Sequence, residues 1–352
     1  MAKFNYNSDF MSRKQDNELE RLEERLTAIY ANATNEVEAT FTDFMGAFQP
    51  QYNEMTKLLE EGAITEAEFE EWSRNKILKS KMYNSAVETM TETLVNTDIL
   101  AMATVNNELP LVIAQSYNFV QSLGFAAADE AGLSVGTFQV YNARTVQAII
   151  KNNPDVLKGV NKITDYRWNK DRINNAITHS IINGDSISQA ANKLKEISNM
   201  DKNAAIRNAR TAMTAAENLG RSEAADDLEA KGIPVEEIWS ATLDDRTRDT
   251  HLLLNGTKRD ENGEFGADIL DIPLRFPGDP QGAPEEIYNC RCRMSIQLKG
   301  IDHSQDGKMY EEFMKEQHPE DWQAMRQSER EIDRSEQRSD AIQYTEDLKA
   351  SR

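Results

Sequence analysis

Apolar residues recur every three or four positions through most of the first half of the chain. Between Asp16 and Phe48 they form one stripe flanked by Glu and Arg, which is typical of an amphipathic helix. The stripe contains Leu19, Leu22, Leu26, Ile29 and Tyr30. Gly46 and Pro50 are expected to end this helix. Because such a stripe is stable only when it is buried, the pattern predicts long helices packed antiparallel or as an extended stem.

A helix-to-helix turn is predicted at residues 62–65, followed by further long helices. Thr65 is a good N-cap, and Glu68 three residues later completes a capping box. The next apolar pattern runs from Phe69 with few breakers until Asn106 and Asn107. A separate helix is expected over residues 110–122, and another over 141–151.

The second half continues with helices until about residue 231. Residues 165–183 predict a helix with four large residues on its buried side, namely Trp168, Ile173, Ile177 and Ile181. Ser186 and Gln189 form a second capping box, which opens a short helix. A long helix is then expected over residues 201–231, stopped by Gly232 and Pro234.

The pattern of apolar and polar residues changes after Pro234. Residues 237–242 read as a strand and residues 244–254 as a short helix. The segment 256–284 is rich in Gly, Pro and Asp, so it is expected to be mostly loop. Residues 290–298 alternate well enough for a closing strand, which makes a small α+β module.

The predicted fold class is therefore mainly α, with a long helical N-terminal region and a small C-terminal α+β module. We divide the chain into a helical region at 1–152, a unit at 153–299 made of helices and the small module, and a tail at 300–352. The tail is charged and acidic, with few large apolar residues, so it is expected to be a solvated helix or disordered.

The amino-acid composition argues against several classes of protein function. A formal net charge of −20 argues against a protein whose main task is to coat nucleic acid, because binding phosphates requires clustered Lys and Arg. Two cysteines in 352 residues do not make a disulfide framework and favour a reducing compartment. The N-terminus lacks the apolar core of a signal peptide, and no apolar run approaches the roughly twenty residues of a membrane span. A cytosolic protein, or one assembled in the cytosol, is expected.

The densest group of chemically active side chains lies between Trp239 and Cys292 and includes both cysteines. In a helix over residues 244–254, Asp244 and His251 would lie almost two turns apart on one face. For Asp244 we favour helix capping over a functional role. For His251 we favour a hydrogen-bonded position in the core over a catalytic one.

Cys290 and Cys292 are separated by one residue. On a strand they would share a face with α-carbons about 6–7 Å apart, which is poor geometry for a disulfide. Together with His251 and Asp244 they would make a tetrahedral set suited to zinc. We favour two buried thiols packed beside a histidine, with zinc as the alternative. A nucleophilic Cys–His site is a further alternative, although no oxyanion-hole loop or third orienting group is recognisable.

Basic residues are concentrated on the long helix expected at 201–231. The four cations considered for contact with nucleic acid are Lys202, Arg207, Arg210 and Arg221. Ion pairs with neighbouring Glu and Asp on solvated faces are the default interpretation, and contact with phosphates is the alternative.

Taken in order, these motifs resemble the phage Mu F-like head morphogenesis proteins, also called minor capsid proteins. The motif residues of the module are Trp239, Thr242, Asp244, Arg246, Thr247, Arg248, His251, Gly256, Cys290, Arg291 and Cys292. Upstream, residues 209–211 and Asn218 fit the same pattern, although Ala212 stands where relatives often have an acid. The resemblance covers about residues 165–298.

The resemblance implies a virion protein of a tailed bacteriophage that acts in head morphogenesis, DNA packaging or DNA delivery. Such proteins are made in the host cytoplasm and lie inside the capsid near the portal, and some are ejected with the genome. The implied partners are the portal protein, the major capsid or scaffolding protein, and phage DNA, with no membrane anchor. The implied role is structural, not enzymatic, and requires no cofactor.

Three alternatives to this role are a metal-dependent enzyme, a thiol-dependent enzyme and a DNA-binding accessory protein. Some relatives carry a toxin domain after the Mu F-like module. Here residues 300–352 are too few and too polar for a typical enzyme domain.

Overall fold

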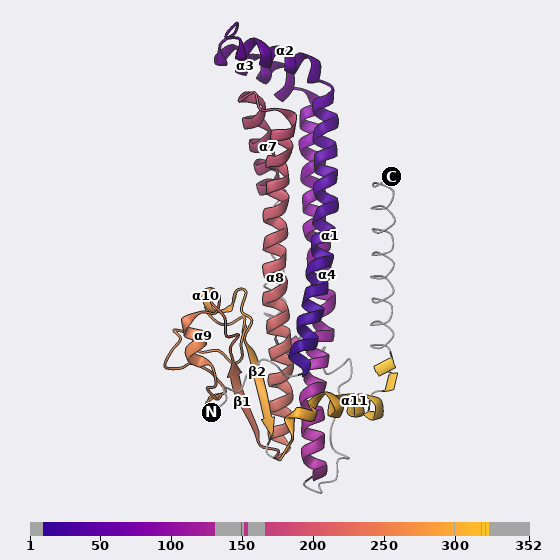
Figure 1. The fold of residues 1–352 in the computed structure, drawn as a ribbon, viewed down its shortest axis with the longest axis vertical. Coiled ribbons are helices and arrows are strands. Elements are labelled where there is room, and N and C mark those ends of the chain that lie inside the picture. Colours follow the sequence, from indigo (N-terminus) through magenta and orange to yellow (C-terminus); the bar gives the residue numbers. More distant parts are fainter. Residues whose placement is uncertain are drawn as a thin grey trace, which may run out of the picture.

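Three long helices lie alongside one another and form a rod. They are α1 (Phe10–Gly46), α4 (Lys81–Glu130) and α8 (Ile187–Ala230), and each packs against the other two. A fourth helix, α7 (Tyr166–Ile182), lies beside α8 toward one end of the rod, and a small module projects from the rod near the other end (Figure 1). The computed structural model describes residues 10–130, 149, 151–153, 166–298, 300–317, 319–320 and 322–323. The prediction of a mainly α fold with a small α+β module is confirmed.

Short helices cover the end of the rod farthest from the module. They are α2 (Gln49–Glu60), α3 (Glu66–Ser73) and the π-helical turn Arg74–Leu78. The predicted capping box at the start of α3 is confirmed, because Thr65 N donates to Glu68 Oε2 at 2.9 Å and Glu68 N donates to Thr65 Oγ1 at 3.3 Å.

Two of the long helices are longer than the sequence predicts. Helix α4 continues through Asn106 and Asn107 and contains Pro110, although a break was expected there. Helix α8 is one helix from the confirmed Ser186 capping box onward, although two helices were expected. Ser198, near the expected break, is buried and its Oγ lies 2.6 Å from the hydroxyl of Thr34 on α1. Packing between the helices therefore outweighs the local breakers.

The rod contains two hydrophobic clusters, one after the other along its length. The first joins the end of α1, the start of α4, α7 and the start of α8, and it includes Ile173, Ile177 and Ile181 as predicted. Trp168 was expected beside them, but its side chain is 48% exposed and stacks on Arg172 at 4.1 Å from the ring centroid. The second cluster joins the other end of the rod to the module, so the module and the helices share one core.

The module is built on a two-stranded antiparallel sheet. Strand β1 (Val235–Ser240) pairs with β2 (Arg293–Leu298) from one end to the other, and the helices α9 (Asp249–Leu254) and α10 (Pro284–Ile287) lie in the chain between them. Helix α9 was expected to begin at residue 244, and β2 was expected to begin at residue 290. Both elements are shorter, so the two cysteines precede the strand instead of lying on it.

After the module, helix α11 (Asp306–Gln317) packs back onto α4. Tyr310, Phe313 and Met314 are buried, and the rings of Phe119 and Phe125 on α4 contact the first two. The tail is helical here, which is one of the two expected states, but one face of this helix is buried and not solvated. Most of the rest of the tail, and most of the helix expected at 141–151, lie outside the described residues. In the described part of the chain, no helix is both long and apolar enough to cross a bilayer.

Candidate functional site

One imidazole and two thiols meet inside the module. His251 comes from α9, and Cys290 and Cys292 come from the segment between α10 and β2. Nδ1 of His251 lies 3.7 Å from Sγ of Cys290 and 3.3 Å from Sγ of Cys292. None of the three side chains is more than 2% exposed. Sequence reasoning placed these three residues in one cluster, and the structure brings them together.

The far side of the imidazole faces a carboxylate. Nε2 of His251 lies 3.0 Å from Oε2 of Glu286 on α10, which also accepts a hydrogen bond from Thr250 Oγ1 at 3.0 Å. This close contact does not have the geometry of a hydrogen bond. The ring of Trp239 packs edge-to-face against the imidazole at 5.1 Å between centroids. Sequence reasoning missed Glu286, the third group beside the histidine.

Side-chain hydroxyls hold the backbone that carries the cysteines. Asn289, in the left-handed conformation with φ of 56°, turns the chain toward Cys290. The hydrogen bonds join Asn289 N to Thr211 Oγ1 at 2.8 Å, Thr214 Oγ1 to Cys290 O at 2.9 Å, and Thr242 Oγ1 to Arg291 O at 2.9 Å. Two of these three hydroxyls come from α8, so the position of the thiols is set by the rod.

Asn218 on α8 completes this support. Its side-chain oxygen accepts a hydrogen bond from Met294 N at 2.7 Å. Its side-chain nitrogen donates to Pro277 O at 2.9 Å and to Cys292 O at 3.2 Å. The residue is fully buried, so these bonds are shielded from bulk solvent. One amide therefore joins the rod, the loop before α10 and the start of β2.

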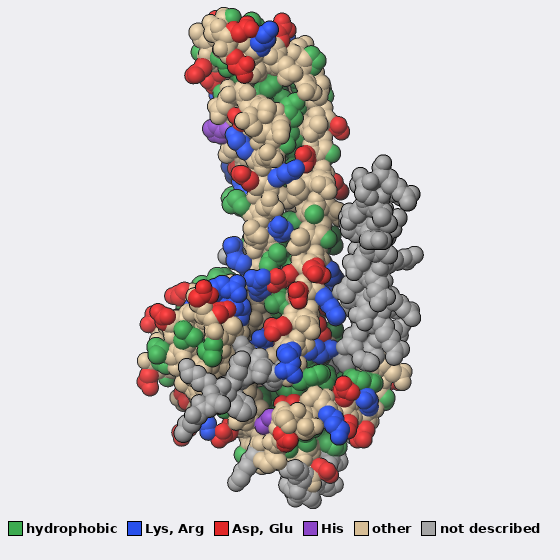
Figure 2. Space-filling model, viewed as in Figure 1, with side chains coloured by type: hydrophobic (Ala, Val, Ile, Leu, Met, Phe, Trp, Pro, Cys, Tyr) green, Lys and Arg blue, Asp and Glu red, His purple; other side chains and the backbone are tan. Residues whose placement is uncertain are grey.

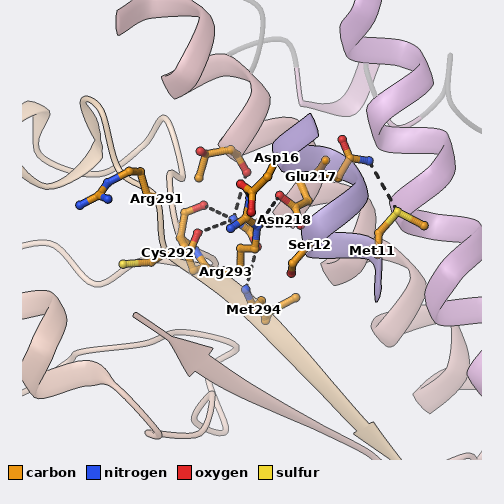
Figure 3. Close-up of polar contacts among 12 residues, drawn as sticks. Met11, Ser12, Asp16, Glu217, Asn218, Arg291, Cys292, Arg293 and Met294 are labelled. Carbon is orange, nitrogen blue, oxygen red and sulfur yellow. Dashed lines mark hydrogen bonds and ion pairs between the residues drawn. The ribbon is translucent and has the colours of Figure 1, made fainter. Parts of the chain in front are cut away.

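A network of charged residues next to Asn218 ties the module to the first helix (Figure 3). The buried Glu217 accepts from Arg221 at 2.9 Å and from Nε of Arg293 at 3.0 Å. Arg293 also reaches Asp16 on α1 at 2.5 Å, and Arg221 donates to Ser12 Oγ at 3.2 Å. Burial opposes the charge of Arg293, but Glu217 and Asp16 outweigh it and raise the pKa of the guanidinium.

Asp244 is not part of the cluster around His251. Arg291 holds its carboxylate with two hydrogen bonds, at 2.6 and 2.7 Å. The same carboxylate accepts from Arg246 N and Thr247 Oγ1, both at 3.1 Å, and so closes a turn. These contacts, led by Arg291, hold the pKa of Asp244 well below its usual range. The expectation that Asp244 caps the helix is wrong, because the N-cap of α9 is Arg248.

The remaining motif residues shape the loops around the site. Arg248 donates to Tyr288 O at 2.5 Å, whereas the Arg246 side chain is exposed. Gly256 adopts φ of +82°, and its N–H donates to Trp239 O at 2.8 Å, which closes the turn after α9. Arg246, Arg248 and Gly256 organise the backbone, whereas the Trp239 side chain and the Thr242 backbone interact with Cys292.

The four basic residues considered for nucleic acid do not form one surface. Arg221 is completely buried in the network described above, so the expectation that it contacts phosphates is wrong. Arg210 forms a two-pronged pair with Glu23 on α1 at 2.5 and 2.8 Å. Arg207 is exposed and Lys202 is half-buried. Where the module meets the rod, Figure 2 shows Lys and Arg interspersed with Asp and Glu.

The two thiols differ in character. Hydrogen bonding from Cys292 and His251 lowers the pKa of Cys290. The contact with Cys290 and burial raise the pKa of Cys292. Both sulfurs face the same imidazole nitrogen, whereas a thiol nucleophile needs one sulfur that a substrate can reach. The arrangement is better suited to binding a cation between the three groups than to attacking a substrate.

The chain is similar to one protein family and to two known proteins of different kinds. Residues 171–295 match the family model described as Phage Mu protein F like protein. The chain is 25% identical over 298 residues to minor head protein GP7 of Bacillus phage SPP1, an alignment that covers 84% of this chain and 88% of GP7. It is 29% identical over 130 residues to the NAD(+)–arginine ADP-ribosyltransferase EFV of Enterococcus faecalis, covering 36% of this chain and 26% of EFV. No solved structure matches the chain.

Proposed function

Because residues 171–295 match the family model described as Phage Mu protein F like protein, we propose that this protein is a minor head protein of a tailed bacteriophage with a role in head morphogenesis. The observation that carries the proposal is the similarity to GP7, which extends over most of both chains. It includes helices outside the family segment, so the rod and the module are related to GP7 as one unit. The virion is the location that this proposal implies.

The shape of the molecule suits a strut between two head components. Helix α4 alone has 50 residues, which corresponds to about 75 Å at 1.5 Å per residue. The rod carries the module near one end and the α2–α3 cap at the other (Figure 1). We propose that the helical end docks onto the portal or a capsid subunit, while the module faces the interior of the head. A function in DNA packaging or delivery would follow from that position.

The proposed role is not enzymatic. The similarity to EFV covers only about a quarter of that protein, so it does not by itself assign transferase activity to this chain. The thiols that a thiol-dependent enzyme would need are buried. A measurable test is NAD hydrolysis or transfer of ADP-ribose to arginine by the purified chain, for which we expect no turnover above a heat-denatured control.

The experiment that tests the head assignment is mass spectrometry of purified heads and of mature virions. We expect the chain in heads at a few copies for each portal. Its absence from both particles would refute the proposal. Co-expression with the portal protein or with the major capsid protein of the same phage, followed by size-exclusion chromatography, then distinguishes the two docking partners. Co-elution with the capsid protein alone would refute the portal association and keep the head assignment.

A further inference from the structure

We propose that His251, Cys290 and Cys292 bind one Zn²⁺ ion through the imidazole Nδ1 and the two sulfurs. The three ligand atoms lie within 4.8 Å of one another in the described part of the chain. Zinc bonds of about 2.0–2.1 Å to nitrogen and 2.3 Å to sulfur, at a tetrahedral angle, separate the two atoms by about 3.6 Å. The observed separations of 3.3 and 3.7 Å from Nδ1 to the sulfurs bracket this value.

The surroundings of the imidazole support ligation through Nδ1. Glu286 lies at the opposite nitrogen, 3.0 Å away, so it favours the tautomer with the proton on Nε2. That tautomer leaves the lone pair of Nδ1 directed at the two sulfurs. A carboxylate behind a histidine is the usual support of a zinc ligand, because it fixes the ring and increases its basicity. In the structure, Nε2 is buried and Glu286 is the carboxylate that faces it.

The two sulfurs are positioned before any ion binds. The backbone from Asn289 to Met294 is fixed by hydrogen bonds from α8 and from Thr242, as described above. In addition, Cys292 N donates to the sulfur of Cys290 at 3.4 Å, which is the kind of N–H···S contact that stabilises a metal-bound thiolate. Trp239 is fully buried beside the ring, and its side chain interacts with Cys292 in the same cluster. Rigid supports of this kind lower the cost of assembling the ligands.

The ligand set also selects the metal. Two thiolates and one imidazole favour Zn²⁺ over Mg²⁺ or Ca²⁺, which prefer oxygen. Among the described residues Asp244 does not provide a fourth donor, because Arg291 occupies both of its oxygens. The described residues therefore supply three ligands to the ion. The ion would join α9 to the start of β2, and this inference is independent of the head assignment.

The test uses the full chain, purified from a zinc-supplemented culture and dialysed. Elemental analysis is expected to give one zinc per chain. The single variants Cys292→Ser and His251→Gln are expected to lose at least nine-tenths of it. Asp244→Asn and His179→Gln, which changes an exposed histidine on α7, are the matched controls and are expected to keep it. Loss of zinc from His179→Gln, or retention in both ligand variants, would overturn the assignment.

A second measurement does not depend on the folding of variants. The wild-type protein is freed of metal with a chelator under reducing conditions and then titrated with Co²⁺. We expect thiolate-to-cobalt charge-transfer bands, together with the visible d–d absorption of a tetrahedral site, to saturate at one equivalent. Zn²⁺ added afterwards is expected to abolish these bands. Absence of the charge-transfer bands, together with zinc-free protein from the supplemented culture, would overturn the proposal.

Discussion

Replacing Asn218 with alanine tests how the cysteine segment is held. The change removes the only side chain in the described structure that bonds both Met294 N and the carbonyls of Pro277 and Cys292. The variant would leave three buried backbone groups, the Met294 N–H and the two carbonyls, without this partner. Each such group costs about 1–3 kcal/mol of folding free energy. Local relaxation recovers part of this, and we expect Asn218→Ala to lower the free energy of unfolding by about 3–5 kcal/mol.

The assay is urea unfolding followed by two signals. Tryptophan fluorescence includes Trp239, which lies in the module, whereas circular dichroism at 222 nm is dominated by the rod. The matched control is Asn203→Ala, an exposed position on the same helix, which should change stability by no more than about 0.5 kcal/mol. A loss below about 1 kcal/mol for Asn218→Ala, relative to Asn203→Ala, would show that this amide does not hold the segment.

Two further predictions concern helix packing and pH. A Cβ on Gly220 would lie 2.4 Å from Ile113 O on α4, so Gly220→Ala should cost about 1–3 kcal/mol. A Cβ on Gly46 would have no neighbour within 4 Å, so Gly46→Ala should be neutral or stabilising. Equal thermal unfolding midpoints for Gly220→Ala and Gly46→Ala would contradict this reasoning. Burial raises the pKa of Glu237 from 4.5 to about 7, although Arg259 lies 2.8 Å away. The folded state then holds a proton that the unfolded state has released, so the stability contributed by Glu237 is present below pH 4.5 and is lost as the pH rises through 7. Urea midpoints at pH 5 and 7.5 should therefore differ less in Glu237→Gln than in wild type, and an unchanged difference would refute the assignment.

Local sequence patterns predicted where helices begin, but they did not predict where the helices end. The capping boxes at Thr65 and Ser186 were predictable because each is completed within four residues. The breaks expected near Asn106 and Ser198 do not occur, because contacts with distant helices decide whether a polar residue interrupts a buried helix. Ser198, for example, meets Thr34 across 164 positions of sequence. No local pattern reports such a contact.

The candidate site was predictable in part for the same reason. The grouping of His251 with the two cysteines followed from their density in one short region. The exclusion of Asp244 depends on Arg291, which lies 47 positions later and takes both carboxylate oxygens. Glu286 gave no signal in the sequence, because acidic residues are frequent in this chain and only its place beside the imidazole distinguishes it.

The limits of the family segment agree with the hydrogen bonds of the site. The match begins at residue 171, inside α7, and therefore includes all of α8, the helix that supplies Thr211, Thr214 and Asn218 to the cysteine segment. A module that began at β1 would lack these supports. Asp16 on α1, outside the segment, then pairs with Arg293 and fixes the module on the rod. Because the supports of the site and the shared core both cross this junction, the rod and the module are expected to move as one body, which the proposed strut would require.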